Sequence, residues 1–411
     1  MKKARLAIDG GRPVRSSPLA FHQADIGEKE LSAIRAVFES GWLTRGKLTQ
    51  KFEKAFAKLK GADYALAVSS CTSALELALR VAGVGAEDEV ILSPLAFPSP
   101  ANAVVRLGGK PIFVDAREDT FCLDEKKVES AITTKTKAVI CVHYGGSPCE
   151  MRLLLGICRE RKIFLIEDCA HAVHASYLGK PLGTWGDFGC FSFYPTKELT
   201  TIEGGMLLCK RKAHREVAYR WHLHGFIEDG AEDWRGGIPP VKDAIKIRTP
   251  KVRDSTLPGH KFNLTDVESA VGLVQLKKVK RAWRRRRQIA RTYDDAFSRL
   301  SGIRLQKHLP GASPSYHLYP IVLWEKSLRR HREKIMEALL AEGISTSTHF
   351  YPVHLMSFYR KAFGTRMGLF PVAERIGLGV ITLPIYHLMT DKDVDDVISA
   401  LFRVLAHFSA P

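Results

Sequence analysis

Apolar residues recur at helical spacing in two stretches near the start of the chain, residues 28–40 and 47–59. The apolar positions are Leu31, Ile34, Val37 and Phe38 in the first stretch and Phe52, Phe56 and Leu59 in the second. The segment between them, residues 41–46, begins and ends with glycine and is typical of a loop. The pattern therefore predicts two helices joined by a short connection.

From residue 60 to residue 210, short apolar runs alternate with helical patterns. The predicted strands cover residues 64–69, 89–93, 110–115, 137–143, 163–168, 189–193 and 205–210. The predicted helices between them include residues 72–84, 99–106 and 151–161. This alternation favours an α/β fold with a mostly parallel sheet that helices cover on both faces.

The pattern changes after residue 225. Residues 226–258 are rich in Gly, Pro, Asp and Lys, which is typical of a long irregular excursion that is functional or mobile. The remaining pattern predicts a helix over 264–300, strands over 316–324, 345–351 and 380–383, a helix over 327–342, and a last helix over 391–408 capped by Thr390. We expect a large domain over residues 1–275 and a smaller α+β domain over residues 276–411.

Composition narrows the class of protein. The 411 residues are 45% hydrophobic and 26% charged, which is ordinary for a globular protein and excludes a disordered, collagenous or fibrous chain. A chain of this length can bury a large core. The sequence contains no run of about 18 apolar residues and no apolar stretch at its start. We therefore expect neither membrane insertion nor a secretory signal.

The chain is strongly basic, with 62 Lys and Arg against 44 Asp and Glu, a net charge of +18. Such a balance is compatible with nucleic acid, an anionic surface or a phosphorylated small substrate. The densest basic run, residues 277–287, lies in a predicted helix, and we interpret it as a solvated helix face. Charge alone therefore does not decide the function. The eight cysteines lack C-x-x-C spacing, which favours reduced thiols and a cytoplasmic location.

Asp168 and Lys197 are the strongest candidates for chemistry. Asp168 ends a predicted apolar strand, and Lys197 lies in a loop just after another one. Ligands of open α/β sheets bind beyond the carboxyl ends of the strands. A partly desolvated lysine can form a Schiff base, and an aspartate can hold a pyridinium nitrogen protonated, which are the two groups that a pyridoxal phosphate site needs. Taken singly, a strand-end Asp is more often a turn residue and a loop Lys is usually solvated.

A phosphate site is expected to accompany this pair. Residues 68–75 read as a strand end, a hydroxyl-rich stretch and the start of a helix. Helix N-termini offer free N–H groups to phosphate, and Thr72 and Ser73 add hydroxyl groups. Simple capping of the helix is an equally good interpretation of this spacing.

In combination, these motifs resemble the DegT/StrS family of pyridoxal-phosphate-dependent sugar aminotransferases. The motifs that carry the resemblance are Ser40–Thr44, Ser69–Leu79, Glu167–His171, Gly186–Phe193, Lys197 with Glu203–Gly205, and Asn263–Asp266. The resemblance covers about residues 15–405. It implies the type I aminotransferase fold, an α/β fold with a mostly parallel central sheet and a smaller C-terminal α+β domain.

The resemblance also implies roles for single residues. Lys197 would be the Schiff-base lysine and proton shuttle, Asp168 the partner of the pyridine nitrogen, and His171 a neighbour of the ring hydroxyl. Phe97 would stack on the ring. Thr72, Ser73 and Ser192 would hold the phosphate, together with Asn263 of a neighbouring subunit, which implies a homodimer with shared sites. Two positions depart from the family: Cys71 stands where Gly is common, and Ala96 where Thr is common.

Substrate-binding residues are less distinct. The resemblance implies that Trp42, His317, His349 and Tyr351 meet the substrate, although for the two histidines a place in the core is an equally good interpretation. His143 follows a strand and is expected near the site, in a structural role. No metal-ligand cluster stands out among the 15 histidines.

The expected reaction moves an amino group from L-glutamate or glutamine to a nucleotide-linked keto sugar. Residues 259–266 and the C-terminal third most resemble UDP-4-amino-4-deoxy-L-arabinose aminotransferases, which favours a 4-keto sugar. Residues 6–14 instead resemble members that act on keto-cyclitols such as scyllo-inosose or that make aminohydroxybenzoate. Dehydratases of the family carry His in place of Lys197. A basic regulatory protein on the same fold is a further alternative, against which the intact Asp168–Lys197 pair argues. We expect no nucleic acid partner.

Overall fold

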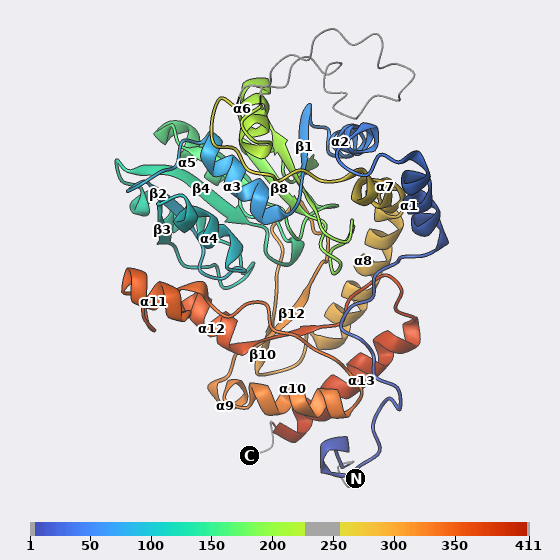
Figure 1. The fold of residues 1–411 in the computed structure, drawn as a ribbon. Helices are drawn as coiled ribbons and strands as arrows, with labels where there is room; N and C mark the ends of the chain where they lie inside the picture. Colours follow the sequence, from blue (N-terminus) through green and yellow to red (C-terminus); the bar gives the residue numbers. More distant parts are fainter. Residues whose placement is uncertain (1–4, 227–254, 409–411) are drawn as a thin grey trace.

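A computed structural model describes residues 5–226 and 255–408, so the predicted excursion over residues 226–258 lies almost wholly outside the described residues. The centre of the fold is a seven-stranded sheet with the order β1-β9-β8-β5-β4-β2-β3 (Figure 1). Its strands are β1 (Tyr64–Val68), β2 (Glu89–Leu92), β3 (Lys110–Phe113), β4 (Thr136–Val142), β5 (Phe164–Asp168), β8 (Phe188–Ser192) and β9 (Gly205–Cys209). Strands β3, β2, β4, β5 and β8 pair in parallel, and β9 pairs antiparallel with β8 and β1.

Helices cover both faces of this sheet, as the sequence predicts. Along β5, Leu165 packs into the core of one face and Ile166 into the core of the other, because successive side chains of a strand point to opposite sides. The first core includes residues of α2 (Lys47–Lys60) and α5 (Met151–Arg161). The second core includes residues of α3 (Cys71–Val81), α4 (Ser99–Arg106) and α6 (Lys212–His222). Burial on both faces explains why the strands read as continuous apolar runs.

Hydroxyl side chains start several of the helices. The Oγ of Ser70 accepts a hydrogen bond from the N–H of Ser73 and so caps α3. Thr265 and Glu268 form a capping box at the start of α7 (Asp266–Leu276). The predicted cap Thr390 is confirmed, because its Oγ1 accepts from the N–H of Asp393 in α13 (Asp391–Phe408).

The C-terminal third builds a smaller antiparallel sheet with the order β10-β12-β13. Its strands are β10 (Ile303–Leu305), β12 (Tyr319–Leu323) and β13 (Val380–Leu383). The accompanying helices are α8 (Val279–Phe297), α9 (Lys326–Arg329), α10 (Arg332–Ala341), α11 (Ser357–Phe363), α12 (Pro371–Gly379) and α13. Figure 1 shows this part below the large sheet, with α10 and α13 on its outer side. Leu6 and Leu19 from the N-terminal segment join its core. The boundary at residues 275/276 stays a prediction.

The remaining elements are small or peripheral. A short sheet, β11-β6-β7, brings β11 (Ala312–Ser313) next to β6 (Ser176–Tyr177) and β7 (Lys180–Pro181). Helix α1 (Glu28–Ser40) has the predicted bounds and packs against α7.

Three predicted elements of secondary structure are wrong. The helix expected over 264–300 is two helices, α7 and α8, which separate at Lys277 and Lys278. The helix expected over 327–342 is likewise divided into α9 and α10. Residues 345–351 form no strand; only Ser347 pairs, with Thr382 of β13, and the segment instead lines a cavity described below.

The basic run over residues 277–287 also needs a correction. Lys280, Arg281, Arg284 and Arg287 are exposed, as a solvated face requires, but Arg286 is buried in α8. All eight cysteines are buried and unpaired. None of the described helices is long and apolar enough to cross a bilayer.

Candidate active site

A cavity of about 570 Å³ opens beyond the carboxyl ends of β4, β5 and β8, where an open α/β sheet is expected to bind its ligand. The predicted residues that line it are Thr72, Phe97, Asp168, His171, Ser192, Lys197, His317 and His349. They come from the ends of β5 and β8, from the start of α3 and from loops, and they lie up to 277 residues apart in the chain, Thr72 to His349, so it is the fold that brings them together. The predicted catalytic pair, Asp168 and Lys197, therefore lines one cavity.

Asp168 ends β5 and is buried, with 5% of its surface exposed. Its Oδ1 accepts a hydrogen bond from the N–H of Ala170 at 3.0 Å and lies 3.8 Å from the Sγ of Cys71. Burial raises the pKa of Asp168, and the Ala170 N–H and the Lys197 ammonium act in the opposite direction. A cationic partner in the cavity would therefore stabilise the ionised carboxylate.

Lys197 lies in the turn that follows β8, and its backbone N–H donates to the carbonyl of Tyr194 at 2.9 Å. Burial of the side chain lowers the pKa of Lys197, while the nearby carboxylate of Glu198 raises it. A depressed pKa increases the share of neutral amine, which is the form that can act as a nucleophile or base.

The start of α3 faces the cavity from the other side. Ser70, Cys71 and Thr72 line the cavity, and the first-turn N–H groups of a helix have no partner within the helix. The Oγ1 of Thr72 lies 2.6 Å from the Oγ of Ser99, so the hydroxyl is held in place. Ser192 adds a further hydroxyl at the end of β8. Helix dipole, N–H groups and hydroxyls together form a suitable site for phosphate.

Histidines form another part of the cavity lining. The rings of His171 and His317 stack with centroids 4.6 Å apart, and the rings of His171 and Phe350 stack with centroids 5.8 Å apart. Burial, reinforced by the Lys197 charge, lowers the pKa of both histidines well below its usual range. Their Nδ1 atoms are buried and make no hydrogen bond with the described residues. Two neutral rings with unused polar atoms are thus available to a ligand.

Four predicted residues do not line this cavity. Ser73 lies behind Ser70, and its Oγ contacts the hydroxyls of Ser69 and Ser70 at 3.0 and 2.9 Å. Trp42 lies in the loop after α1 and donates from its ring to the carbonyl of Arg45. Tyr351 is exposed beside the cavity residue Phe350.

Asn263 is the fourth. It directly precedes the helix expected over 264–300, but the helix α7 begins two residues later than expected and Thr265 caps it. Asn263 instead forms a bridge with Val68 at the end of β1, and its amide donates to the carbonyl of Leu264 at 3.3 Å.

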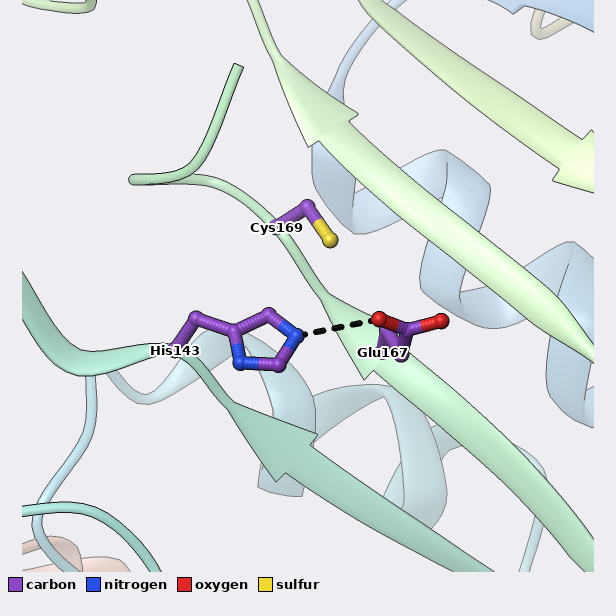
Figure 2. Close-up of side chains that lie close together, drawn as sticks. All are labelled: His143, Glu167 and Cys169. Atoms are coloured by element: carbon purple, nitrogen blue, oxygen red, sulfur yellow. Dashed lines mark hydrogen bonds and ion pairs between the residues drawn. The ribbon is translucent and has the colours of Figure 1, made fainter. Parts of the chain in front are cut away.

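His143, Glu167 and Cys169 form a buried cluster, to which β5 contributes Glu167 (Figure 2). The carboxylate of Glu167 accepts four hydrogen bonds, from the N–H groups of Gly183, Trp185 and Gly186 and from Nε2 of His143. The Nδ1 of His143 accepts from the N–H of Cys149. Both carboxylate oxygens and both ring nitrogens are therefore engaged with the protein. We interpret the cluster as a support for the loop over residues 183–186, in line with the structural role expected for His143.

The cavity also includes residues of the N-terminal segment that the sequence pattern does not indicate. Phe21 and His22 line the cavity; Phe21 stacks on His349 with centroids 5.5 Å apart, and His22 lies 3.0 Å from the carbonyl of Pro195 in the Lys197 loop. No local motif marks them, because tertiary packing brings the segment there: Leu19 pairs with Ile344, and Asp25 binds Lys278.

Comparison with known proteins gives one consistent result. The family model described as the DegT/DnrJ/EryC1/StrS aminotransferase family matches residues 24–402. The spore coat polysaccharide biosynthesis protein SpsC of Bacillus subtilis is 39% identical over 377 residues, which cover 92% of this chain and 94% of SpsC.

Two solved structures extend this result to three dimensions. A sugar aminotransferase assigned as Spr1654 from Streptococcus pneumoniae, in its PMP form, superposes with a TM-score of 0.87 at 29% identity, covering 95% of this chain and all of that one. PseC of Helicobacter pylori, an aminotransferase involved in the biosynthesis of pseudoaminic acid, has a TM-score of 0.85 at 26% identity with the same coverage. The fold expected from the sequence is therefore confirmed.

Proposed function

The chain belongs to the DegT/DnrJ/EryC1/StrS aminotransferase family and is a pyridoxal-phosphate-dependent sugar aminotransferase. We propose that it moves an amino group from L-glutamate or glutamine to a nucleotide-linked 4-keto sugar. One observation carries the proposal: Asp168 and Lys197, an acid and an amine with pKa values displaced by burial, line the same cavity. A non-catalytic protein would have no need to keep this pair buried and facing a common space.

The cavity residues fit pyridoxal phosphate. The hydroxyls of Ser70, Thr72 and Ser192, with the start of α3, would hold the phosphate in place of the predicted Ser73. Asp168 would bind the ring nitrogen, and the unused Nδ1 of His171 is available to the ring hydroxyl. Once bound, the cofactor supplies an electron-withdrawing ring that stabilises negative charge on the carbon that loses its proton.

The protein's part in the chemistry is proton handling. The Nζ of Lys197, whose pKa burial lowers, would accept the α-proton of the amino donor and would later give a proton to the carbon that carries the transferred nitrogen. Asp168 would keep the ring nitrogen of the bound cofactor protonated. Phe97, whose ring lies 5.9 Å from that of Phe350, covers the same space with an apolar surface.

Two observations support a nucleotide-linked sugar as acceptor. The net charge of +18 is compatible with a substrate that carries phosphates. SpsC is described as a spore coat polysaccharide biosynthesis protein, and PseC as an aminotransferase involved in the biosynthesis of pseudoaminic acid.

The test is a substrate panel. Purified holoenzyme is incubated with L-glutamate or L-glutamine and, in turn, with nucleotide-linked 4-keto sugars and scyllo-inosose, and the aminated product is identified by mass spectrometry. We expect turnover with a nucleotide 4-keto sugar. Turnover with scyllo-inosose alone would replace the proposed acceptor with a keto-cyclitol, and absence of cofactor binding would contradict an active site here.

We further propose a homodimer whose sites are shared through Asn263. Asn263 lies outside the cavity of its own chain, and α1 leaves Leu31 and Phe38 exposed, at 53% and 61% of their surface. Mixing Lys197→Ala chains with Asn263→Ala chains tests this, because each heterodimer then has one site with both lesions and one with neither. Activity above that of either parent is expected after subunit exchange. Proven exchange without recovered activity would contradict sharing through Asn263.

A further inference from the structure

The thiol of Cys71 contacts the carboxylate of Asp168. Its Sγ lies 3.8 Å from Oδ1, within reach of a weak S–H···O hydrogen bond. Cys71 is the first residue of α3 and is the one cysteine among the described residues that line the cavity. The contact joins the predicted phosphate-binding helix to the predicted partner of the ring nitrogen.

The hydrogen bonds to Asp168 are unevenly divided between its two oxygens. The Ala170 N–H and the Cys71 thiol both approach Oδ1, whereas Oδ2 has no hydrogen-bond donor among the described residues. Two donors on one oxygen fix the rotation of the carboxylate and leave the other oxygen to a ligand.

We propose that Cys71 is a positioning residue: its thiol donates to Oδ1 of Asp168 and thereby holds Oδ2 for the ring nitrogen of the cofactor. The proposal rests on the proposed function, since it concerns how this chain orients Asp168 toward pyridoxal phosphate.

Two features keep the thiol in this role. Burial and the neighbouring Asp168 carboxylate raise the pKa of Cys71 well above its usual range, so the thiol keeps its proton and remains a donor. The backbone of Cys71 is also fixed. A Cβ on Gly205 would lie 2.7 Å from the Cys71 nitrogen, which shows how closely β9 packs under the start of α3.

Substitutions at Cys71 separate a hydrogen-bond donor from a space-filling side chain. Cys71→Ala removes the donor, whereas Cys71→Ser restores one with an O–H. Cys158→Ala is the matched control, because Cys158 is also buried but lies in α5 and makes no hydrogen bond with Asp168. Each holoenzyme is checked for folding by circular dichroism. The dissociation constant for pyridoxal phosphate and the visible absorption spectrum of the bound cofactor are then measured.

We expect Cys71→Ala to weaken cofactor binding by about 3- to 10-fold, as the loss of one weak hydrogen bond to a charged group implies. It should also change the ratio of the absorption bands, and Cys71→Ser should restore both properties. Equal affinity and spectra in wild type and Cys71→Ala, or equal losses in Cys71→Ala and Cys71→Ser, would overturn the proposal while leaving the proposed function intact. Failure of the wild type to bind the cofactor would overturn both.

Discussion

Two neighbouring carboxylates on β5 have opposite surroundings. Glu167 points to one face of the sheet and Asp168 to the other, because side chains alternate along a strand. The Glu167 carboxylate accepts four hydrogen bonds from the protein. The Asp168 carboxylate makes its contacts through one oxygen and leaves the other to the cavity. A buried carboxylate whose oxygens all accept hydrogen bonds from the protein stabilises the fold. A buried carboxylate with one oxygen free of such bonds can bind a ligand.

The same contrast extends to the residues around each carboxylate. Behind Glu167, His143 uses both ring nitrogens in hydrogen bonds. In front of Asp168, the Nδ1 atoms of His171 and His317 are buried without a partner among the described residues. Leaving such groups unpaired costs free energy, and a bound ligand can offset that cost. The cavity side is therefore the part of the molecule where substitutions should change activity more than stability.

The largest effect is expected from Lys197→Ala. The variant lacks the amine that accepts and returns the proton, so turnover should fall by at least about 10⁴-fold, the upper range for general acid–base groups. Its fold should remain intact, because the hydrogen bond from Lys197 to the carbonyl of Tyr194 comes from the backbone N–H, which alanine keeps. Steady-state kinetics and thermal unfolding check the two expectations, and turnover near that of the wild type would refute the assignment of Lys197.

Asp168→Asn should have the next largest effect. The amide keeps the shape of the side chain but cannot hold the ring nitrogen protonated, so turnover should fall by about 10²-fold or more. Stability should change little, because the Asn oxygen can still accept from the Ala170 N–H. Unchanged kcat in this variant would reduce Asp168 to a structural strand-end residue.

Glu167→Gln tests the carboxylate on the opposite face of β5. The Gln NH₂ group would face N–H donors of the loop over residues 183–186, so at least one buried donor loses its acceptor. The free energy of unfolding should fall by about 2 kcal/mol, the usual cost of such a loss. Urea unfolding measures this change, with Glu160→Gln on the exposed side of α5 as control. A stability loss in Asp168→Asn larger than that in Glu167→Gln would reverse the interpretation of the two sides.

Much of the large sheet and of the catalytic pair could be predicted from the sequence. Strand ends are marked by the change from apolar to polar residues, and Asp168 and Lys197 each follow such an end. The helices α4 and α5 have the predicted bounds for the same reason. The spacing of apolar residues predicts the bounds of a helix or strand well where one face of that element, or both, packs against the core.

The remaining features depend on contacts between distant segments. Nothing in the sequence of Lys277 and Lys278 ends a helix; the chain turns there while Lys278 binds Asp25 and Glu30 of the N-terminal region. The hydroxyl-rich residues 345–351 favour a strand by composition, yet the structure uses Ser347 and His349 in the cavity wall. The place of His22 beside the Lys197 loop follows from tertiary packing and not from a sequence motif, so the sequence alone does not indicate it.

The smallest expected effect is a pH dependence of stability on the cavity side. Burial lowers the pKa of His349 to about 4, against an ordinary value of 6.5. As the pH falls from 6.5 toward 4, the unfolded chain therefore takes up a proton that the folded chain does not, and the free energy of unfolding decreases. The slope can reach about 1.4 kcal/mol per pH unit for one such histidine. In His349→Gln, whose amide can still meet the Oγ1 of Thr382, the decrease between pH 7 and pH 5 should be smaller than in the wild type, whereas the exposed control His407→Gln should keep the wild-type slope. Urea unfolding of the holoenzyme at several pH values measures both slopes. Equal slopes for wild type and His349→Gln would mean that His349 titrates alike in the folded and unfolded chain, and the cavity wall would then be wetter than the packing of Phe21 against His349 indicates.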